Sequence, residues 1–407
     1  MSYRIDRLDD FGRGITFVKN KICFVSNALV GEEVDINILS EKSKYLEANS
    51  TKVFKKSKSR IDTKCPYYNL CGGCNVSHMN FIEELNFKKN KVERILKKYA
   101  KVNNGVKEII KTDRFNYRNK ATLKVKDGNL GYFQNKSYDL VNIDSCLLCT
   151  NRINEVIKEL NTINLQGINE IVIRCNKKNE ILLYLIGIIE NENYYLDNLK
   201  DVENIVISNY KNIKTIKGNN YIIDSIGDMS FRVSYNSFFQ VNTYGVEVLY
   251  EKVKEYADLT GRESVLDLYC GTGTIGMYLS SFAKDVYGIE INKNAVNDAI
   301  FNKELNNIKN IDFLCEDISK IKNNFKDVDL IIIDPPRSGL SLEAISNILS
   351  IKSKRIIYVS CEPMTLARDL NIIKEEYDFK EITLVDMFPN TYHVETVSVL
   401  CRKTIEK

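Results

Sequence analysis

The sequence predicts an α/β protein whose C-terminal part folds as a doubly wound parallel sheet. Beyond Phe231, short apolar runs alternate with segments of helical periodicity, a pattern typical of parallel βα units. The run Val265–Leu268 also enters a glycine-rich turn, where a parallel sheet commonly binds a ligand. Residues 1–57 instead alternate apolar and polar positions over short stretches, which predicts a small β-barrel in front of that sheet.

The length of 407 residues predicts several domains, which we assign to residues 1–57 (a barrel), 58–230 (a central α+β domain) and 231–407 (the parallel sheet). No apolar run approaches the length of about 18 residues that suggests a membrane span. The N-terminus does not resemble a signal peptide. We therefore expect a soluble, cytoplasmic protein that acts as a monomer. In that setting, eleven cysteines favour thiols and metal ligands over disulfides.

Two segments of the central domain carry many cations. The helix expected over Phe81–Tyr99 has lysines on one face and an apolar face formed by Phe81, Leu85, Val92, Leu96 and Tyr99. After it, residues 114–120 interleave arginine and lysine with Phe115 and Tyr117. Such a mixture suits phosphates and unstacked bases, although an ordinary exposed strand has the same composition.

The glycine-rich turn predicts a nucleotide-like ligand. Gly271, Gly273 and Gly276 match the G-x-G-x-x-G pattern, and Glu290 ends the next expected strand, where an acid can bind ribose hydroxyls. Nicotinamide dinucleotides and S-adenosylmethionine both fit these features. The acid on the strand before the turn, together with Asp334 followed by two prolines at the end of a later strand, favours the methyl donor.

Cys361 is the candidate nucleophile. It follows the apolar run Ile356–Val359 and so lies at the carboxyl end of an expected parallel strand, where α/β proteins perform chemistry. Glu395 lies near the start of the last expected strand, Val394–Cys401, and is the candidate base. A thiol and a carboxylate suit methylation of a pyrimidine at C5, because thiolate addition at C6 activates C5 and a base must then remove the C5 proton.

Three cysteines within ten residues, Cys65, Cys71 and Cys74, predict a metal site. A zinc ion would be bound by Cys71, Cys74, Cys146 and Cys149. An iron–sulfur cluster would instead use all three early cysteines and one later cysteine. The spacing alone leaves both possibilities open.

Taken together, these motifs resemble the S-adenosylmethionine-dependent RNA uridine-5-methyltransferases, and most closely the 23S ribosomal RNA branch with a TRAM barrel and a [4Fe-4S] cluster. The resemblance implies a class I methyltransferase fold with a TRAM/OB-like barrel, and Cys361 and Glu395 as nucleophile and base. It also implies that Cys146 is the fourth cluster ligand beside Cys65, Cys71 and Cys74. The implied S-adenosylmethionine site comprises Gln240, Tyr269, Gly271, Glu290, Asp317 and Asp334.

The implied substrate is 23S rRNA, with the target uridine flipped out of a loop. Two alternatives are a tRNA uridine-5-methyltransferase and an RNA-binding module with a degenerate catalytic domain. The second arises from one departure: the family usually has Ser-Cys-Asn-Pro, whereas Glu362 follows Cys361 in this chain. The resemblance also suggests that the helix after Cys74 packs on the C-terminal domain, so that the domain boundaries interleave.

Overall fold

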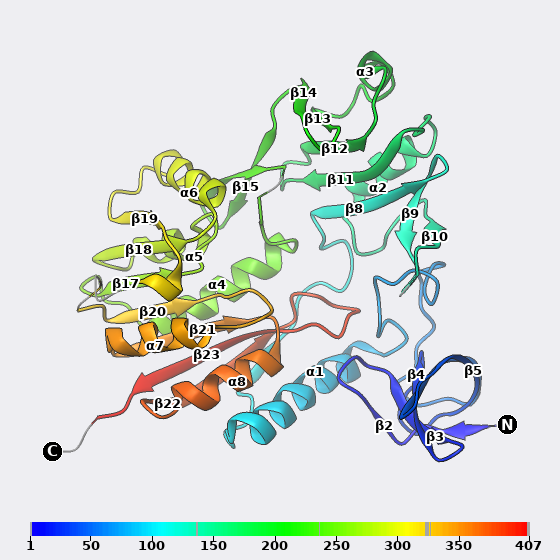
Figure 1. Cartoon of the computed structure of the whole chain (residues 1–407), viewed down its shortest axis with the longest axis horizontal. Coiled ribbons are helices and arrows are strands. Elements are labelled where there is room, and N and C mark those ends of the chain that lie inside the picture. The colour runs from blue at the N-terminus through cyan, green and yellow to red at the C-terminus, as the bar shows by residue number, and fades with distance from the viewer. Residues whose placement is uncertain (1, 136, 236, 322–324, 326, 405–407) are drawn as a thin grey trace.

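The computed structural model describes residues 2–135, 137–235, 237–321, 325 and 327–404, which form four sheets (Figure 1). The N-terminal sheet has the order β1-β5-β6-β4-β3-β2. Tyr3–Arg4 pairs with β5 while Arg7–Leu8 pairs with β3, so one short segment brings the two sheet edges together. The strands are β1 (Tyr3–Arg4), β2 (Arg7–Leu8), β3 (Gly14–Val18), β4 (Lys21–Ser26), β5 (Glu33–Glu41) and β6 (Tyr45–Lys55).

Helix α1 (Phe81–Ile95) continues as a π-helical turn, Leu96–Ala100, and lies beside α8 of the C-terminal domain (Figure 1). Our assignment of its faces was wrong in part, because Tyr99 is 42% exposed and Lys88 is completely buried. Carboxylates surround the Lys88 ammonium and compensate its charge, which sequence periodicity cannot reveal. The buried face consists of Glu84, Phe87, Lys88, Lys91, Val92 and Ile95.

The central sheet has the order β10-β9-β8-β11-β12-β13-β14, and α2 (Asn151–Leu160) buries its apolar face in the same core. The helix begins at Thr150, whose side chain accepts a hydrogen bond from the Ile153 amide. A further helix, α3 (Glu192–Asn198), precedes β13. The strands are β8 (Lys120–Lys126), β9 (Asn129–Phe133), β10 (Leu140–Asn142), β11 (Ile168–Cys175), β12 (Ile181–Gly187), β13 (Asn204–Ser208) and β14 (Ile213–Lys217). A hairpin of β15 (Tyr221–Ile226) and β16 (Met229–Ser234) leads to the C-terminal domain.

The C-terminal sheet has the order β19-β18-β17-β20-β21-β23-β22-β7, with helices on both faces (Figure 1). The strands are β7 (Glu108–Ile110), β17 (Ser264–Leu268), β18 (Asp285–Glu290), β19 (Ile311–Cys315), β20 (Leu330–Ile333), β21 (Arg355–Ser360), β22 (Tyr377–Val385) and β23 (Glu395–Arg402). The helices are α4 (Thr243–Ala257), α5 (Thr274–Ser280), α6 (Lys293–Leu305), α7 (Leu342–Ile351) and α8 (Pro363–Ile373), with a 3₁₀ turn at Ile318–Lys320.

The C-terminal sheet confirms the doubly wound α/β fold, with β23 as an antiparallel insertion between β21 and β22. Strand β7 joins this sheet although it precedes the central domain's sheet in sequence. Val92 and Ile95 of α1 also share a core with Leu366 and Leu370 of α8. The C-terminal core therefore recruits residues from two separate parts of the chain. In the part of the chain that is described, no helix is long and apolar enough to cross a membrane.

Candidate active site and cysteine-lined cavity

The turn after β17 leaves its backbone open to a ligand. Tyr269 takes a positive φ of 61°, a conformation that non-glycine residues seldom adopt. The Gly271 amide donates to a carboxylate oxygen of Glu290 at 3.2 Å, so the acid at the end of β18 supports the turn. A Cβ atom added at Gly271 would meet nothing within 4 Å. A ligand can therefore approach the backbone at Gly271 closely.

Acidic side chains cluster along the carboxyl ends of β17 and β20. Asp267 is fully buried, and its Oδ2 accepts a hydrogen bond from the Gly276 amide at 2.8 Å. Burial and the nearby Asp334 and Glu290 raise the pKa of Asp267 to about 8. Burial likewise raises the pKa of Asp334 to about 7. Such a cluster favours a ligand that brings positive charge, as the sulfonium of S-adenosylmethionine does.

Two further predicted cofactor residues, Tyr269 and Asp317, lie near each other and near Glu290 at this edge of the sheet. Burial raises the pKa of the Tyr269 hydroxyl to about 12, and the nearby Asp317 and Glu290 charges add to the effect. Asp317 caps the 3₁₀ turn, because its carboxylate accepts a hydrogen bond from the Ser319 amide at 2.9 Å. Gln240 lies just before α4, and its backbone carbonyl accepts a hydrogen bond from Asn119 at 3.1 Å.

Strand register brings Cys361 and Glu395 together. Strands β21 and β23 are antiparallel, and Ser360 is paired with Thr396 at the end of the ladder. The Thr396 hydroxyl reinforces this pairing by donating to the Ser360 carbonyl at 3.0 Å. Continuing the register by one residue beyond that last pair sets Cys361 opposite Glu395, close enough for the Glu395 charge to act on the thiol. Two residues separated by a helix and a strand in sequence thus become neighbours.

The Cys361 thiol is protonated in this environment. Burial and the Glu395 charge raise its pKa to about 12, whereas the Arg337 charge and a hydrogen bond to Arg337 oppose the increase. Burial and Asp334 raise the pKa of Glu395 to about 8, again opposed by Arg337. Sequence reasoning did not assign a role to Arg337. The sequence feature that could have indicated such a role is the position of Arg337 directly after the two prolines that follow Asp334.

Glu362 acts on the helix rather than on the thiol. It is the N-cap of α8, and its Oε1 accepts a hydrogen bond from the Met364 amide at 3.2 Å. Its charge also favours the protonated Lys91 on α1, whose pKa burial lowers to about 8. An asparagine, the usual family residue, is a good N-cap as well. The departure from the family pattern therefore preserves the capping function.

One cavity of about 390 Å³ is lined by all four predicted metal ligands, namely Cys65, Cys71, Cys74 and Cys146. Cys149 is fully buried and hydrogen-bonds to Cys146, which lowers the pKa of the Cys146 thiol to about 6. Arg114, Arg118 and Lys120 also line the cavity. Cationic walls suit a group that is bound through thiolates.

Within the described residues, no three potential ligands are grouped as a single metal ion requires. The zinc site that the spacing allowed, with Cys71, Cys74, Cys146 and Cys149 as ligands, is therefore not preformed in the part of the chain that is described. In a [4Fe-4S] cluster each thiolate binds a different iron, so the sulfur atoms surround the cluster rather than meeting at one point. The shared cavity, the thiol donors and the adjacent cations fit that arrangement.

Comparison with known proteins identifies the family. A family model described as tRNA (Uracil-5-)-methyltransferase matches residues 80–403. The chain belongs to this family. It is an S-adenosylmethionine-dependent RNA (uracil-5) methyltransferase, which confirms the family resemblance of the sequence motifs.

Relatives of this methyltransferase match almost the entire chain. An uncharacterized RNA methyltransferase of Clostridium acetobutylicum is 34% identical, covering 98% of this chain and 96% of its own. One from Staphylococcus aureus is 31% identical, covering 95% of both chains. The crystal structure of Pyrococcus abyssi tRNA (uracil-54, C5)-methyltransferase in complex with S-adenosyl-L-homocysteine has a TM-score of 0.81 and 28% identity. That alignment covers 98% of this chain and 100% of the other.

Proposed function

We propose that this methyltransferase forms 5-methyluridine in RNA by addition and elimination, with Cys361 as nucleophile and Glu395 as base. The observation that carries the proposal is the β21–β23 register, which sets the two side chains opposite each other at the carboxyl edge of the sheet. A buried cysteine alone would be weak support. A buried carboxylate facing it supplies the second group that the reaction needs.

The reaction has three steps. The Cys361 thiol first loses its proton to solvent, and the thiolate, which the Arg337 charge favours, adds to C6 of the uracil and makes C5 nucleophilic. C5 then accepts the methyl group, which S-adenosylmethionine supplies when bound. Finally the Glu395 carboxylate takes the proton from C5, the C5–C6 double bond re-forms, and the C6–S bond breaks to release Cys361 as a thiolate. A base of this kind typically contributes about 10²–10⁴ in rate.

Arg337 and Asp334 prepare the two reacting groups. Arg337 favours the ionised forms of both Cys361 and Glu395. Asp334 opposes ionisation of Glu395, so a cation bound beside Asp334 relieves that opposition. The donor's sulfonium carries such a charge. Gln240, Tyr269, Gly271, Glu290 and Asp317 are the remaining residues that we propose to hold the donor.

The proposed substrate is 23S rRNA, in keeping with the resemblance of the cysteine and barrel motifs to that branch of the family. Arg114, Phe115, Arg118 and Lys120 line the cysteine cavity and supply cations and one aromatic ring for an unstacked loop. Tyr117, the other ring of this segment, is buried and donates its hydroxyl to the Pro389 carbonyl instead. A tRNA is the second candidate. The Pyrococcus enzyme acts on uracil-54 of tRNA and aligns over 98% of this chain, so the N-terminal domains alone do not separate the two substrates.

We propose that Cys65, Cys71, Cys74 and Cys146 hold a [4Fe-4S] cluster. The support is their common cavity and the exclusion of Cys149 from its lining. The cluster would brace the segment around Cys74 against the rest of the central domain. Anaerobically purified protein should contain about four iron atoms per chain and be brown. Zinc in place of iron would refute the cluster.

Mapping 5-methyluridine by mass spectrometry in 23S rRNA and tRNA, from cells with and without the gene, tests the substrate. Loss of the modification from one RNA class identifies that class as the substrate, and unchanged RNA refutes the proposal.

Two variants test the mechanism in vitro. Cys361→Ala should give neither methylation nor a covalent RNA adduct, whereas Glu395→Gln should accumulate a methylated adduct. Retained turnover in either variant would contradict the assigned role.

A further inference from the structure

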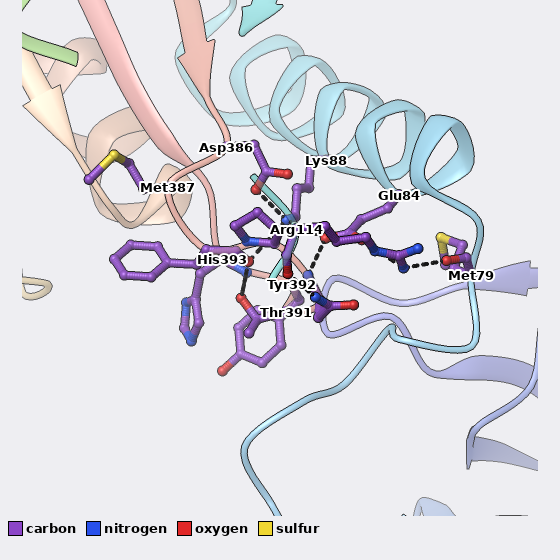
Figure 2. Close-up of polar contacts among 12 residues, drawn as sticks. Met79, Glu84, Lys88, Arg114, Asp386, Met387, Thr391, Tyr392 and His393 are labelled. Carbon is purple, nitrogen blue, oxygen red and sulfur yellow. Dashed lines mark hydrogen bonds and ion pairs between the residues drawn. The ribbon is translucent and has the colours of Figure 1, made fainter. Parts of the chain in front are cut away.

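The loop that leads into Glu395 is held by other parts of the molecule along its length. This loop, residues 386–394, connects β22 to β23, and we call it the base loop. Figure 2 shows Glu84 and Lys88 of α1 pointing at it. The Lys88 ammonium donates to Asp386 Oδ1 at 2.6 Å and to the Phe388 carbonyl at 3.2 Å. These contacts fix the start of the base loop on α1.

The middle of the base loop is fixed by Asn390, which is 1% exposed. Its backbone amide donates to Glu84 Oε1 at 2.6 Å, and its side-chain amide donates to the Arg114 carbonyl at 2.7 Å. It takes a positive φ of 69°, which asparagine tolerates better than most residues. The hydrogen-bonding groups of Asn390 are satisfied in this one conformation, so displacing the residue would break several buried hydrogen bonds.

The same asparagine is bonded to the segment that follows Cys74. Its carbonyl accepts hydrogen bonds from the amides of Asn75 at 3.1 Å and Val76 at 3.2 Å. Its Oδ1 accepts a hydrogen bond from the Ser77 hydroxyl at 3.2 Å. Asn75 directly follows Cys74 in the chain, and Ser77 lies two residues further on. A continuous path therefore runs from Cys74 through the backbone of Asn75 and Val76, and through the Ser77 side chain, to Asn390.

Asn390 also lines the cysteine cavity itself. It therefore belongs both to the wall of that cavity and to the loop that ends at the base, five positions before Glu395. A shift of the cysteine segment has to move or break the bonds at Asn390. The buried groups that bond to Asn390 would then be left unsatisfied, which makes the connection stiff.

We propose that Asn390 is a positioning residue for Glu395, and that through it the segment Cys71–Ser77 sets how well Glu395 removes the C5 proton. This inference rests on the proposed roles of Cys361 and Glu395. It assigns the cysteine region a part in the elimination step that is mechanical rather than redox. Thiolate addition and methyl transfer precede that step, so they depend less on Asn390.

The elimination step can be measured separately. The probe is total RNA from cells that lack the gene, labelled with tritium at C5 of uridine and methylated from carbon-14-labelled S-adenosylmethionine. Tritium leaves only when the base takes the C5 proton, whereas the carbon-14 methyl group enters one step earlier. The early ratio of released tritium to incorporated methyl therefore reports elimination, and denaturing gels report the methylated covalent adduct.

Asn390→Gly is the test variant, because glycine accepts the positive φ and retains the backbone bonds while the side-chain bonds are lost. We expect tritium release to fall about 10- to 100-fold, with methylated adduct accumulating. Asn204→Ala is the matched control. Asn204 is 2% exposed and its amide donates to the Ile181 carbonyl at 3.0 Å, in the central sheet away from the base loop. The control should leave the ratio unchanged.

Ser77→Ala tests the path from the cysteine side and covers the case that Asn390→Gly does not fold. It should shift the ratio in the same direction by a smaller factor. In the Ser77→Ala background, Asn390→Gly should change the ratio less than in the native chain, because the Ser77–Asn390 hydrogen bond is already lost. Additive effects, or a native ratio in both Asn390→Gly and Ser77→Ala, would overturn the inference.

The proposed function can fail independently of this inference. If Cys361→Ala still forms an adduct, or Glu395→Gln turns over, the catalytic roles are wrong. If those two variants behave as proposed while Asn390→Gly matches Asn204→Ala, the roles stand and only the positioning role of Asn390 is wrong.

Discussion

Arg337 sets the ionisation of two reacting groups at once. Its charge lowers the pKa of Cys361 and of Glu395, although burial holds both pKa values above their ordinary range. Arg337→Gln should therefore decrease kcat/KM about tenfold or more at pH 7. The part of the loss that comes from Glu395, with a pKa of about 8, should shrink toward pH 9, whereas the part that comes from Cys361, with a pKa of about 12, should remain. The measurement is the pH profile of kcat/KM for RNA methylation.

Arg337→Lys is the control for this profile, since it retains a cation at the same position. It should lie between the native enzyme and the glutamine variant. For the native enzyme, kcat/KM should increase from pH 6 to 9, because Glu395, with a pKa of about 8, must lose its proton to act as the base. A flat native profile, or no loss in Arg337→Gln at pH 7, would contradict this account.

For single residues, the sequence predicted a role well where the residue type itself implies chemistry. It predicted poorly where the role depends on which charges the fold brings near a reacting group. The family motifs pointed to Cys361 and Glu395, and the strand register sets them opposite each other. Neither the motif nor the periodicity indicated that Arg337 acts on both. Its influence arises from the folded geometry, in which the segment after β20 reaches the end of β21.

Helix α8 carries the residue that departs from the family pattern. Glu362 Oε1 accepts the Met364 amide, so the departure is a helix cap rather than a charge aimed at the thiol. Glu362→Asn should retain methylation activity and native stability, because asparagine caps helices well. Glu362→Ala should lower the free energy of unfolding by about 1 kcal/mol. Urea denaturation and a methylation assay on both variants test this, and a large activity gain in Glu362→Asn would contradict it.

Helix α1 contains a buried charge cluster that joins it to the base loop (Figure 2). Lys88 contacts Glu84 at 2.8 Å and Asp386 at 2.6 Å, and Arg114 lies 3.3 Å from Glu84. Two cations thus balance two carboxylates. Lys88→Met should destabilise the protein by about 3–5 kcal/mol, since it leaves a carboxylate buried without compensation. Chemical denaturation measures the change.

The combination of Lys88→Met with Asp386→Asn serves as the control for that prediction. It removes one charge of each sign, so it should recover part of the lost stability. If the double variant loses as much free energy of unfolding as the two single variants lose in sum, Lys88 and Asp386 are not coupled. The assay needs no RNA, so it separates stability from catalysis.

The helix–strand alternation of the C-terminal part was predictable because each element has an apolar face with its own period. The buried face of α1 was not, because Lys88 and Glu84 are polar yet completely buried. Strand β7 was also missed. It is only three residues long and gains its place by pairing with β22, a partner that follows it by more than 250 residues. Pairings over such distances leave no local pattern in the sequence.

In the whole molecule, α1 and the base loop connect the cysteine cavity to the edge of the sheet where Cys361 and Glu395 lie. The elements come from distant parts of the chain, and buried polar contacts join α1 to the start and the middle of the loop. Buried polar contacts require defined geometry. The central domain and the catalytic domain should therefore unfold together rather than separately.

Three buried carboxyl groups, those of Asp267, Asp334 and Glu395, make the stability of the whole enzyme depend on pH and on the methyl donor. Burial raises the pKa values of Asp267, Asp334 and Glu395 to about 8, 7 and 8, from ordinary values of about 3.8, 3.8 and 4.5. Between these limits the folded state binds protons that the unfolded state does not. The contribution of the three groups to the free energy of unfolding therefore falls as pH rises from about 4 to 8.

S-adenosylmethionine should counteract that loss, because its sulfonium interacts favourably with the ionised carboxylates. S-adenosylhomocysteine has the same adenosine and amino-acid parts but no sulfonium charge. The increase in Tm at saturating S-adenosylmethionine should therefore grow between pH 5.5 and 8.5, whereas the increase with S-adenosylhomocysteine should change less. Comparing the two ligands cancels the background titration of the rest of the protein. In Asp334→Asn, the pH dependences of the Tm increase with the two ligands should lie closer together. If the two dependences are parallel in the native enzyme, the buried carboxylates do not interact with the sulfonium charge of the donor.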